Sequence, residues 1–371
     1  MSGTKKLLVI AGGNYIYGAE KVTLDVMKGL NDAGYEVQAI ISGWGDGQFA
    51  KALDDLKIRY YKLKLGWYYI SKILWSLDSL VHYPGAVIRF LRTRKNFKDW
   101  PVYIISFRQV ILLWPFFKKN IVYHVHDVNS NSKQSRYFFK IVDRKVLKYI
   151  AVSEFIKNDL IKCSIPADKI EVIHNGVEIK PVPLKLSEKT DRLTIGIVGQ
   201  LIPRKGHIDV IEAMKILSDE GINSVMLKII GDGDKEYKRS IEALAKQYKL
   251  DKQVSFLGFQ KTNDEIYGAV DIVITPTRND EPFALVPLEA NAMGKPVIVT
   301  NKGGFPEMIK DGYNGFIVES STPAQIAEKI ALITKNRSLQ VEMGENGRRN
   351  IEQYFTKKIM NTKVKNLIDS I

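Results

Sequence analysis

Short β-branched segments alternate with amphipathic helical segments along almost the whole chain. Strand candidates include KLLVIAG, EVQAIIS and IVYHVHD in the first half, and LTIGIVG, VMLKIIG and DIVITPT in the second. Strands and helices that alternate at this spacing predict parallel sheets covered by helices on both faces. At 371 residues the chain is too long for one ordinary core and long enough for two. We therefore expect an α/β protein with two parallel-sheet domains.

The segment NGVEIKPVPLKLSEKTDR, residues 175–192, separates the two series of strands. It opens with an Asn-Gly turn, contains two prolines and lacks hydrophobic periodicity, which indicates a linker. We expect an N-terminal domain over 1–180, a linker over 181–192 and a C-terminal domain over 193–350. Residues 351–371 are predicted to form a helical tail that crosses back to the N-terminal domain.

Cysteine content and hydropathy limit the cellular compartments in which the protein is expected. The chain has one cysteine, Cys163, which excludes an intramolecular disulfide and suits a reducing compartment. The apolar run after MSGTKK is short and no cleavage pattern follows it, so we interpret it as a first strand rather than a signal peptide. No stretch approaches the roughly 18 apolar residues of a spanning helix. These features favour a cytoplasmic protein.

Positive charge is concentrated in the first half of the chain. Residues 1–180 carry 28 Lys and Arg against 16 Asp and Glu, which accounts for +12 of the net +14. Such a field indicates an anionic partner, whether nucleic acid, a membrane surface or a phosphorylated substrate. On a helix predicted to begin near Ser135, basic residues recur at every fourth position and would form one stripe. They are Arg136, Lys140, Arg144 and Lys148.

A second segment, residues 65–100, mixes aromatic, apolar and basic side chains, a composition that suits the edge of a bilayer. The alternative for both segments is a solvated helical face whose apolar residues fill the protein's own core. We expect contact with an anionic membrane surface at the inner face of the membrane, and we expect no nucleic acid because no recognised binding motif accompanies the charge.

Two glutamates flank the start of one predicted helix. In PTRNDEPFALVPLEANAMG, a loop after a buried strand carries Glu281, and the helix that follows carries Glu289. The first N–H groups of this helix would face the carboxyl edge of the sheet, where open α/β sheets bind ligands and helix starts bind anions. A ligand with a phosphate at the helix start and a polyol at each glutamate has the shape of a nucleotide-sugar. The alternative is that both glutamates are exposed helix-end residues.

A second loop supplies cations. In GIVGQLIPRKGHIDVIEAM, a strand ends at Gly199, and the loop before the next helix carries Arg204 and Lys205. Two cations at the mouth of a sheet can hold a diphosphate and stabilise it as a leaving group, since charge-assisted bonds are typically worth about 1.5–3 kcal/mol each. A solvated surface pair is the alternative.

Together these motifs resemble the retaining family-4 (group 1) glycosyltransferases, which have the GT-B fold of two Rossmann-like domains whose parallel sheets face each other across a cleft. The resemblance covers most of the chain. It is densest in the second half, where GQLIPRKGH, IIGDG, VSFLGF, PTRNDEPFALVPLEANAMGKPVIVTNKGGFPEMI and GYNGFIV occur in the family's order. In the first half, YGAEKVTLDVMKGL, YHVHD, VSEFIKNDL and VIHNGVE also fit.

The resemblance implies a role for each matching residue. Arg204 and Lys205 bind the donor diphosphate, Glu281 holds hydroxyls of the donor sugar, and Glu289 binds the ribose. His126 is the active-site histidine near the transferred sugar. The remaining donor-binding positions are Gly18 in the first-domain loop, Leu257 and Gly258 near the base, and Phe283, Ala284 and Leu285 beside sugar and phosphate.

Three positions depart from the family pattern or leave a choice open. Tyr17 replaces the first glycine of a glycine pair, which leaves the contact between that loop and the donor open. Ala284 stands where glycine is common, which requires a negative φ. YHVHD offers both His124 and His126; His126 lies nearer the carboxyl end of the strand, and the alternative for His124 is a buried core residue.

The resemblance implies transfer of a sugar with retention of configuration, without a metal or other cofactor, from a nucleotide-sugar donor to a lipid-linked or glycan acceptor. A UDP-sugar is favoured, but the residues do not name the sugar, the acceptor or the oligomeric state. Two alternatives stay open: another GT-B enzyme such as a nucleotide-sugar epimerase, and a basic nucleic-acid-binding module.

Overall fold

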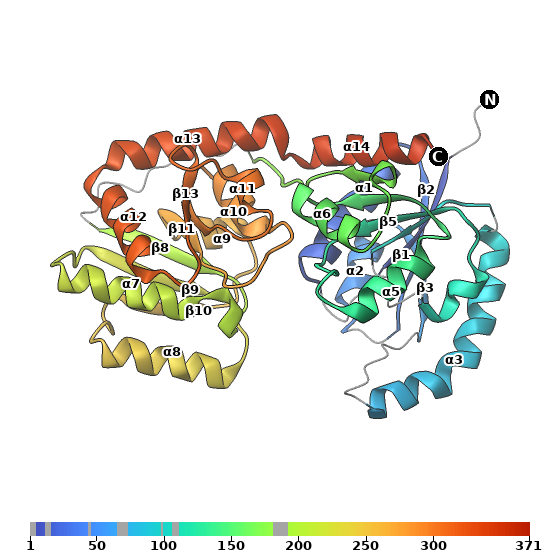
Figure 1. The fold of residues 1–371 in the computed structure, drawn as a ribbon, viewed down its shortest axis with the longest axis horizontal. Coiled ribbons are helices and arrows are strands. Elements are labelled where there is room, and N and C mark those ends of the chain that lie inside the picture. Colours follow the sequence, from blue (N-terminus) through green and yellow to red (C-terminus); the bar gives the residue numbers. More distant parts are fainter. Residues whose placement is uncertain are drawn as a thin grey trace. The chain divides into compact units, whose positions relative to one another are not determined.

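The structure is a computed structural model that describes residues 5–11, 16–43, 46–64, 73–97, 99–105, 111–180 and 192–371. It divides into two compact units (Figure 1). Unit 1 comprises residues 1–175 together with 357–371, and unit 2 comprises residues 176–356. Except for Arg192, the predicted linker over 181–192 lies outside the described residues.

Unit 1 is built on a parallel sheet in the order β3-β2-β1-β4-β5-β6-β7. After β3 the chain returns to pair β4 with the opposite side of β1, so the topological switch point lies between β1 and β4. The interior positions of β1, β2, β4 and β5 are almost fully buried, as expected for strands covered on both faces. The strands are β1 Lys6–Ala11, β2 Glu36–Ser42, β3 Arg59–Leu63, β4 Val102–Ile104, β5 Ile121–Val125, β6 Val146–Ala151 and β7 Ile170–Val172.

Serine caps start two of the helices that cover this sheet. Ser132 Oγ accepts from Ser135 N before α5, and Ser153 Oγ accepts from Ile156 N before α6. The helices are α1 Gly18–Asp32, α2 Gln48–Asp55, α3 Ile73–Arg94, α5 Lys133–Val142, α6 Glu154–Lys162 and α14 Lys357–Asp369. Short 3-10 turns are η1 Lys95–Phe97, η2 Ile111–Phe116 and η3 Ala167–Lys169.

Unit 2 repeats the architecture with a parallel sheet in the order β10-β9-β8-β11-β12-β13. Its switch point lies between β8 and β11, which pair directly with each other. The strands are β8 Leu193–Val198, β9 Val225–Ile230, β10 Val254–Gly258, β11 Ile272–Thr275, β12 Val297–Thr300 and β13 Gly315–Val318. The helices are η4 Pro203–Lys205, α7 His207–Asp219, α8 Lys235–Gln247, α9 Asn263–Tyr267, α10 Leu285–Ala292, α11 Phe305–Met308, α12 Pro323–Lys335 and α13 Arg337–Tyr354.

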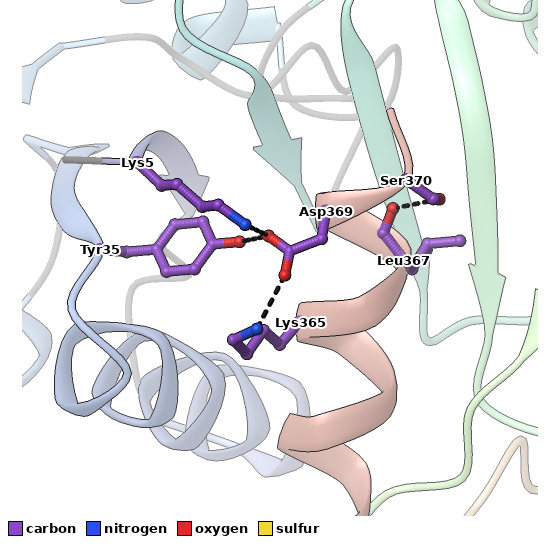
Figure 2. A network of polar contacts seen from close by, with 6 residues as sticks. All are labelled: Lys5, Tyr35, Lys365, Leu367, Asp369 and Ser370. Carbon is purple, nitrogen blue, oxygen red and sulfur yellow. Dashed lines mark hydrogen bonds and ion pairs between the residues drawn. The ribbon is translucent and has the colours of Figure 1, made fainter. Parts of the chain in front are cut away.

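The last helix, α14, packs on unit 1 although it follows unit 2 in the chain. Gly29 of α1 lies so close to Asn361 that a β-carbon there would sit 2.2 Å from the Asn361 amide nitrogen. Near the C-terminus, Asp369 accepts hydrogen bonds from Lys5, Tyr35 and Lys365 (Figure 2). These hydrogen bonds hold the pKa of the Asp369 carboxyl well below its usual range. The end of the chain is therefore tied to the beginning of unit 1 by packing and by charge.

The predicted basic stripe on one helix is wrong. Helix α5 ends at Val142, and the chain turns so that Arg144 lies outside any helix. Lys148 belongs to β6, and its Nζ donates to the carbonyl oxygen of Asp168. The segment that starts at Val146 pairs with β5 on one side and β7 on the other, and this strand pairing overrides the four-residue spacing. Only Arg136 and Lys140 share a helix, and both are exposed there.

Candidate functional site

The candidate donor site begins at the switch point of unit 2. Strands β8 and β11 are neighbours and parallel, so the loops that follow them leave the same edge of the sheet. The loop after β8 leads through η4 into α7, and the loop after β11 leads into α10. The topology therefore brings the predicted cations of one loop beside the predicted glutamate of the other.

Lys205, Arg204 and Glu281 form one cluster across these loops. Lys205 Nζ lies 2.9 Å from Glu281 Oε2, and Arg204 NH1 lies 3.6 Å from the same oxygen. The Lys205 and Glu281 side chains are only 18% and 17% exposed, whereas the Arg204 side chain is 46% exposed. The alternative of a solvated surface pair therefore does not describe Lys205. The cluster places two positive charges beside a carboxylate at the mouth of the sheet.

Further contacts, which the sequence did not predict, hold the two loops together. The Arg204 carbonyl oxygen accepts from Arg278 N at 2.9 Å and from Thr277 Oγ1 at 3.1 Å. Arg278 also binds buried Asp209 of α7 through two bonds, Nε to Oδ2 at 3.0 Å and NH2 to Oδ1 at 2.6 Å. Such a two-point contact fixes the angle between the partners as well as their distance. The sequence gives no local pattern that would predict this pair, because Arg278 and Asp209 lie 69 positions apart.

Two glycines let the backbone approach this cluster. Gly206 has φ +72°, and a β-carbon there would lie 2.0 Å from the Pro276 carbonyl oxygen. Gly303 has φ +58°, and a β-carbon there would lie 2.0 Å from the carbonyl oxygen of Glu281. The neighbouring Gly304 N donates to that same oxygen at 2.9 Å. Any side chain at either glycine would push these loops apart.

Helix α10 starts where the sequence predicts. Ala284 is its N-cap with φ −78° and ψ 139°, so the negative φ that alanine requires is present. Pro287 falls in the first turn, where a missing N–H costs little. Phe283 is buried and Leu285 is the first helical residue. Since the first N–H groups of a helix lack intrahelical partners, this helix start can bind an anion.

Glu289 lies inside α10 and is buried, with only 7% of the residue exposed. The alternative that it is an exposed helix-end residue is therefore wrong. Tyr267 of α9 donates its hydroxyl to Glu289 Oε2 at 2.9 Å. Burial, and then the charge of Glu289, raises the pKa of Tyr267 well above its usual range, so its hydroxyl stays protonated and can donate to the carboxylate. Tyr267 is thus a positioning residue that the sequence did not reveal.

The predicted base-binding positions lie at the end of edge strand β10. The pairing with β9 shifts register between Phe256 and Gly258, which leaves Leu257 as an extra residue in a bulge. Gly258 has φ +66° and its carbonyl oxygen accepts from Gly231 N at 2.9 Å. Phe259, next in the chain, is 70% exposed. The structure places these residues on unit 2, two strands away from β8.

The predicted first-domain residues belong to unit 1. Gly18 is the first residue of α1, which follows β1 at the switch point. His126 follows β5, whereas His124 lies within β5 and is completely buried. Their rings lie on the same side of the strand with centroids 4.1 Å apart.

Two observations separate the roles of the two histidines. His124 Nδ1 forms a hydrogen bond with Tyr103 Oη of β4, which fits the alternative of a buried core residue. Burial lowers the pKa of His126 to about 3, and it lowers the pKa of His124 well below its usual value. Both rings are therefore neutral near pH 7. Among the described residues, Nε2 of both rings is buried and has no hydrogen-bond partner, but only His126 is partly exposed as a residue, so only its ring remains able to meet a ligand group.

No metal centre is found in the parts of the chain that the structure describes. In those ranges no three His, Cys, Asp or Glu side chains gather in a way that could hold a metal ion. The positive charges of the candidate donor site are the side chains of Arg204 and Lys205 and the start of α10.

Two parallel-sheet units with loop–helix sites at their switch points define a Rossmann-like α/β protein, and comparison with known proteins identifies its family. The model of the "Glycosyltransferase Family 4" domain matches residues 16–180, and that of "Glycosyl transferases group 1" matches residues 182–350. The chain belongs to this family of glycosyltransferases and has the GT-B fold.

Several relatives with printed names match part of the chain. An uncharacterized glycosyltransferase of Methanocaldococcus jannaschii is 36% identical over 221 residues, which cover 59% of this chain and 58% of that protein. The capsular polysaccharide biosynthesis glycosyltransferase CapM of Staphylococcus aureus is 31% identical over 248 residues, which cover 62% of this chain and 64% of that protein. The matches thus span about three-fifths of the length of these relatives.

Solved structures show the same fold over the whole chain. HepE of Anabaena in complex with UDP and glucose has a TM-score of 0.80 at 21% identity, covering 99% of this chain and 100% of that one. A glycosyltransferase of Rickettsia africae has a TM-score of 0.82 at 22% identity, covering 99% of this chain and 98% of that one.

Proposed function

We propose that this protein is a retaining glycosyltransferase that moves a sugar from a nucleotide-sugar, with a UDP-sugar favoured, to a glycan or lipid-linked acceptor in polysaccharide or glycoconjugate synthesis. The observation that carries the proposal is the cluster of Lys205, Arg204 and Glu281 beside the start of α10. Family membership supports the reaction class, and the complex of HepE with UDP and glucose supports UDP as the nucleotide.

In this proposal the two glutamates bind the two ends of the donor. Lys205 and Arg204 hold the diphosphate, together with the first N–H groups of α10. Glu281 binds hydroxyls of the sugar, and Glu289 binds the ribose. As the bond between sugar and phosphate breaks, negative charge grows on the diphosphate, and cations already in place stabilise that charge. No divalent ion is needed for this step, because the two side chains and the helix start supply the positive charge.

His126 is proposed to bind the sugar as a neutral ring. Burial keeps the imidazole uncharged near pH 7, so it can exchange a hydrogen bond with a sugar hydroxyl without adding charge to the reacting centre. The departing phosphate then helps to deprotonate the acceptor, which attacks from the face that the phosphate leaves. Retention of configuration follows from this geometry.

The acceptor is proposed to be a glycan or a lipid-linked sugar. CapM is named for capsular polysaccharide biosynthesis, and a mutant of TarM of S. aureus has been solved in complex with fondaparinux, alpha-GlcNAc-glycerol and UDP. A lipid-linked acceptor would place the protein peripherally at the inner face of the membrane, whose anionic lipids attract basic proteins.

A two-stage experiment tests the proposal. A panel of nucleoside diphosphates and nucleotide-sugars is first scored by thermal shift, because a ligand that binds the folded state raises apparent stability. The donor that binds is then incubated with candidate acceptors, with and without EDTA, and the product is analysed by NMR. We expect a retained anomeric configuration and activity in EDTA. An inverted product would contradict the retaining mechanism, and an altered sugar without consumption of the acceptor would identify an epimerase instead.

A further inference from the structure

One face of helix α3 exposes large apolar side chains. Val81, Ile88 and Leu91 are 76%, 51% and 38% exposed. They lie on the side of the helix opposite to Ala86 and Phe90, which are buried in unit 1. Because α3 already packs against unit 1 through that buried side, the exposed apolar residues do not contribute to the core.

The same face carries positive charge. Arg89, Arg92 and Lys95 are exposed beside the apolar residues, the last in the η1 turn that continues α3. Over residues 80–98 the sequence contains five basic residues and no acidic one. Apolar side chains bordered by basic ones, on one side of one helix, are the pattern of a helix that lies in the plane of an anionic bilayer surface.

The placement of α3 makes this face accessible. Figure 1 shows α3 (cyan) at the outside of unit 1, and its N-terminal turns extend away from the other labelled elements of that unit. Packing on the inner side is provided by Phe90, whose ring lies 5.2 Å from that of Phe117. Pro84 lies within α3 and is itself exposed.

We propose that this α3 face, made by Val81, Ile88, Leu91, Arg89, Arg92 and Lys95, docks the protein on an anionic lipid surface. The apolar residues enter the boundary of the acyl chains while the three cations contact lipid phosphates. No helix that the structure describes is long and apolar enough to cross a membrane. The inference is independent of the donor chemistry proposed above.

The size of the effect follows from the charges. A basic residue near an anionic surface strengthens binding about fivefold, so removing three of them weakens it by about a hundredfold if all three reach the lipid. Screening weakens the attraction at high salt, because the Debye length falls from about 10 Å at 0.1 M to about 3 Å at 1 M. Apolar insertion is not screened, so a part of the binding persists in salt.

The test is sedimentation of the full-length protein with vesicles of phosphatidylcholine alone or mixed with phosphatidylglycerol. The first variant combines Arg89→Gln, Arg92→Gln and Lys95→Gln, and the second combines Val81→Ser and Ile88→Ser. The matched control combines Lys51→Gln, Lys133→Gln and Lys162→Gln, which removes the same charge from exposed positions on other helices of unit 1.

We expect the parent to prefer anionic vesicles and the charge variant to bind them about a hundredfold more weakly. The apolar variant should lose the binding that persists in salt. The affinity of the control should stay within a fewfold of that of the parent. Equal losses in the charge variant and the control would overturn the proposal, because net charge rather than α3 would then drive binding. Equal binding of parent and variants would also overturn it. So would self-association that depends on α3, which would identify a second copy as the partner. Thermal shift with UDP, measured on every variant, shows separately whether the donor proposal holds.

Discussion

Replacing Tyr267 by phenylalanine tests whether this tyrosine positions Glu289. The change removes one hydroxyl group and keeps the fully buried ring, so the packing of α9 is preserved. It removes the 2.9 Å bond to Glu289 Oε2, while the second contact of the hydroxyl, to the Val286 carbonyl oxygen, is longer at 3.4 Å. Loss of a hydrogen bond to a charged group should lower the free energy of unfolding by about 1.5–3 kcal/mol.

The effect on ligand binding is smaller and has a different cause. With Tyr267 present, the Glu289 carboxylate is already held in one orientation before a ribose binds. Without it, binding must also immobilise that side chain, which costs about 0.5–1.5 kcal/mol. We therefore expect UDP to bind Tyr267→Phe about two- to tenfold more weakly than the parent. The KM for the donor should rise with little change in kcat, because the ribose does not take part in the bond that breaks.

Calorimetric titration of UDP measures this effect in four proteins: the parent, Tyr267→Phe, Glu289→Ala and the double variant. If Tyr267 acts through Glu289, its removal should cost nothing further once Glu289 is gone. A UDP analogue that lacks the ribose hydroxyls should likewise bind the parent and Tyr267→Phe equally. An undiminished penalty in the Glu289→Ala background would refute the positioning role. Tyr248→Phe, at a partly buried tyrosine packed against the core of unit 2, is the matched control and should bind UDP like the parent.

Three further outcomes are expected. Lys205→Ala and Glu281→Ala should each lower turnover by at least roughly tenfold while the protein stays folded, and near-normal steady-state rates in both would remove the donor assignment. Burial, and then the charge of Lys205, lowers the pKa of His207 to about 4. Acidification from pH 7.5 to 5 therefore protonates this residue only in the unfolded state and should lower the free energy of unfolding by about 2 kcal/mol. Denaturation curves of His207→Phe at the two pH values should not show this loss. Asp369→Asn should destabilise unit 1 by about 1 kcal/mol in urea denaturation, because the ion pair with Lys5 is lost, whereas exposed Asn366→Ala should not.

The local sequence was sufficient to predict the start of α10. Prolines at 282 and 287 restrict where the helix can begin, and Gly294, with φ +68°, follows its end. The four positions between them leave room for one N-cap, which the structure places at Ala284. The cations of the preceding loop were predictable for a similar reason, because they lie between a clear strand and a clear helix. Short-range steric preferences determine both features.

The basic stripe could not be predicted correctly from spacing alone. Residues 133–142 do form a helix, and a four-residue repeat continues past its end to Lys148. The repeat does not reveal that the chain turns at Asp143 and enters the sheet at Val146, because the strand is selected by its pairing with β5 and β7. Periodicity shows which residues would share a face if the helix continued. It does not show whether the helix continues.

Side-chain contacts between residues far apart in the sequence could not be predicted either. Tyr267 and Glu289 are 22 positions apart, and Arg278 and Asp209 are 69 apart, so neither pair produces a local pattern. Each contact supports a predicted feature. The Tyr267 bond holds Glu289, and the Arg278–Asp209 pair holds the loop that carries Lys205. The sequence therefore predicts candidates for ligand contact, while the residues that orient those candidates become apparent only when the sheet brings distant loops together.

The two glutamates differ because they lie on opposite sides of the N-cap. Glu281 precedes Ala284 by three residues and remains in a loop, where its side chain meets cations from the neighbouring strand's loop. Glu289 follows Ala284 by five residues, about 7.5 Å along the axis at 1.5 Å per residue, and is buried beside Tyr267. The helix start lies between them. A spacing of eight thus places one carboxylate on each side of an anion-binding helix end, an arrangement that matches a donor with hydroxyl groups on both sides of a diphosphate.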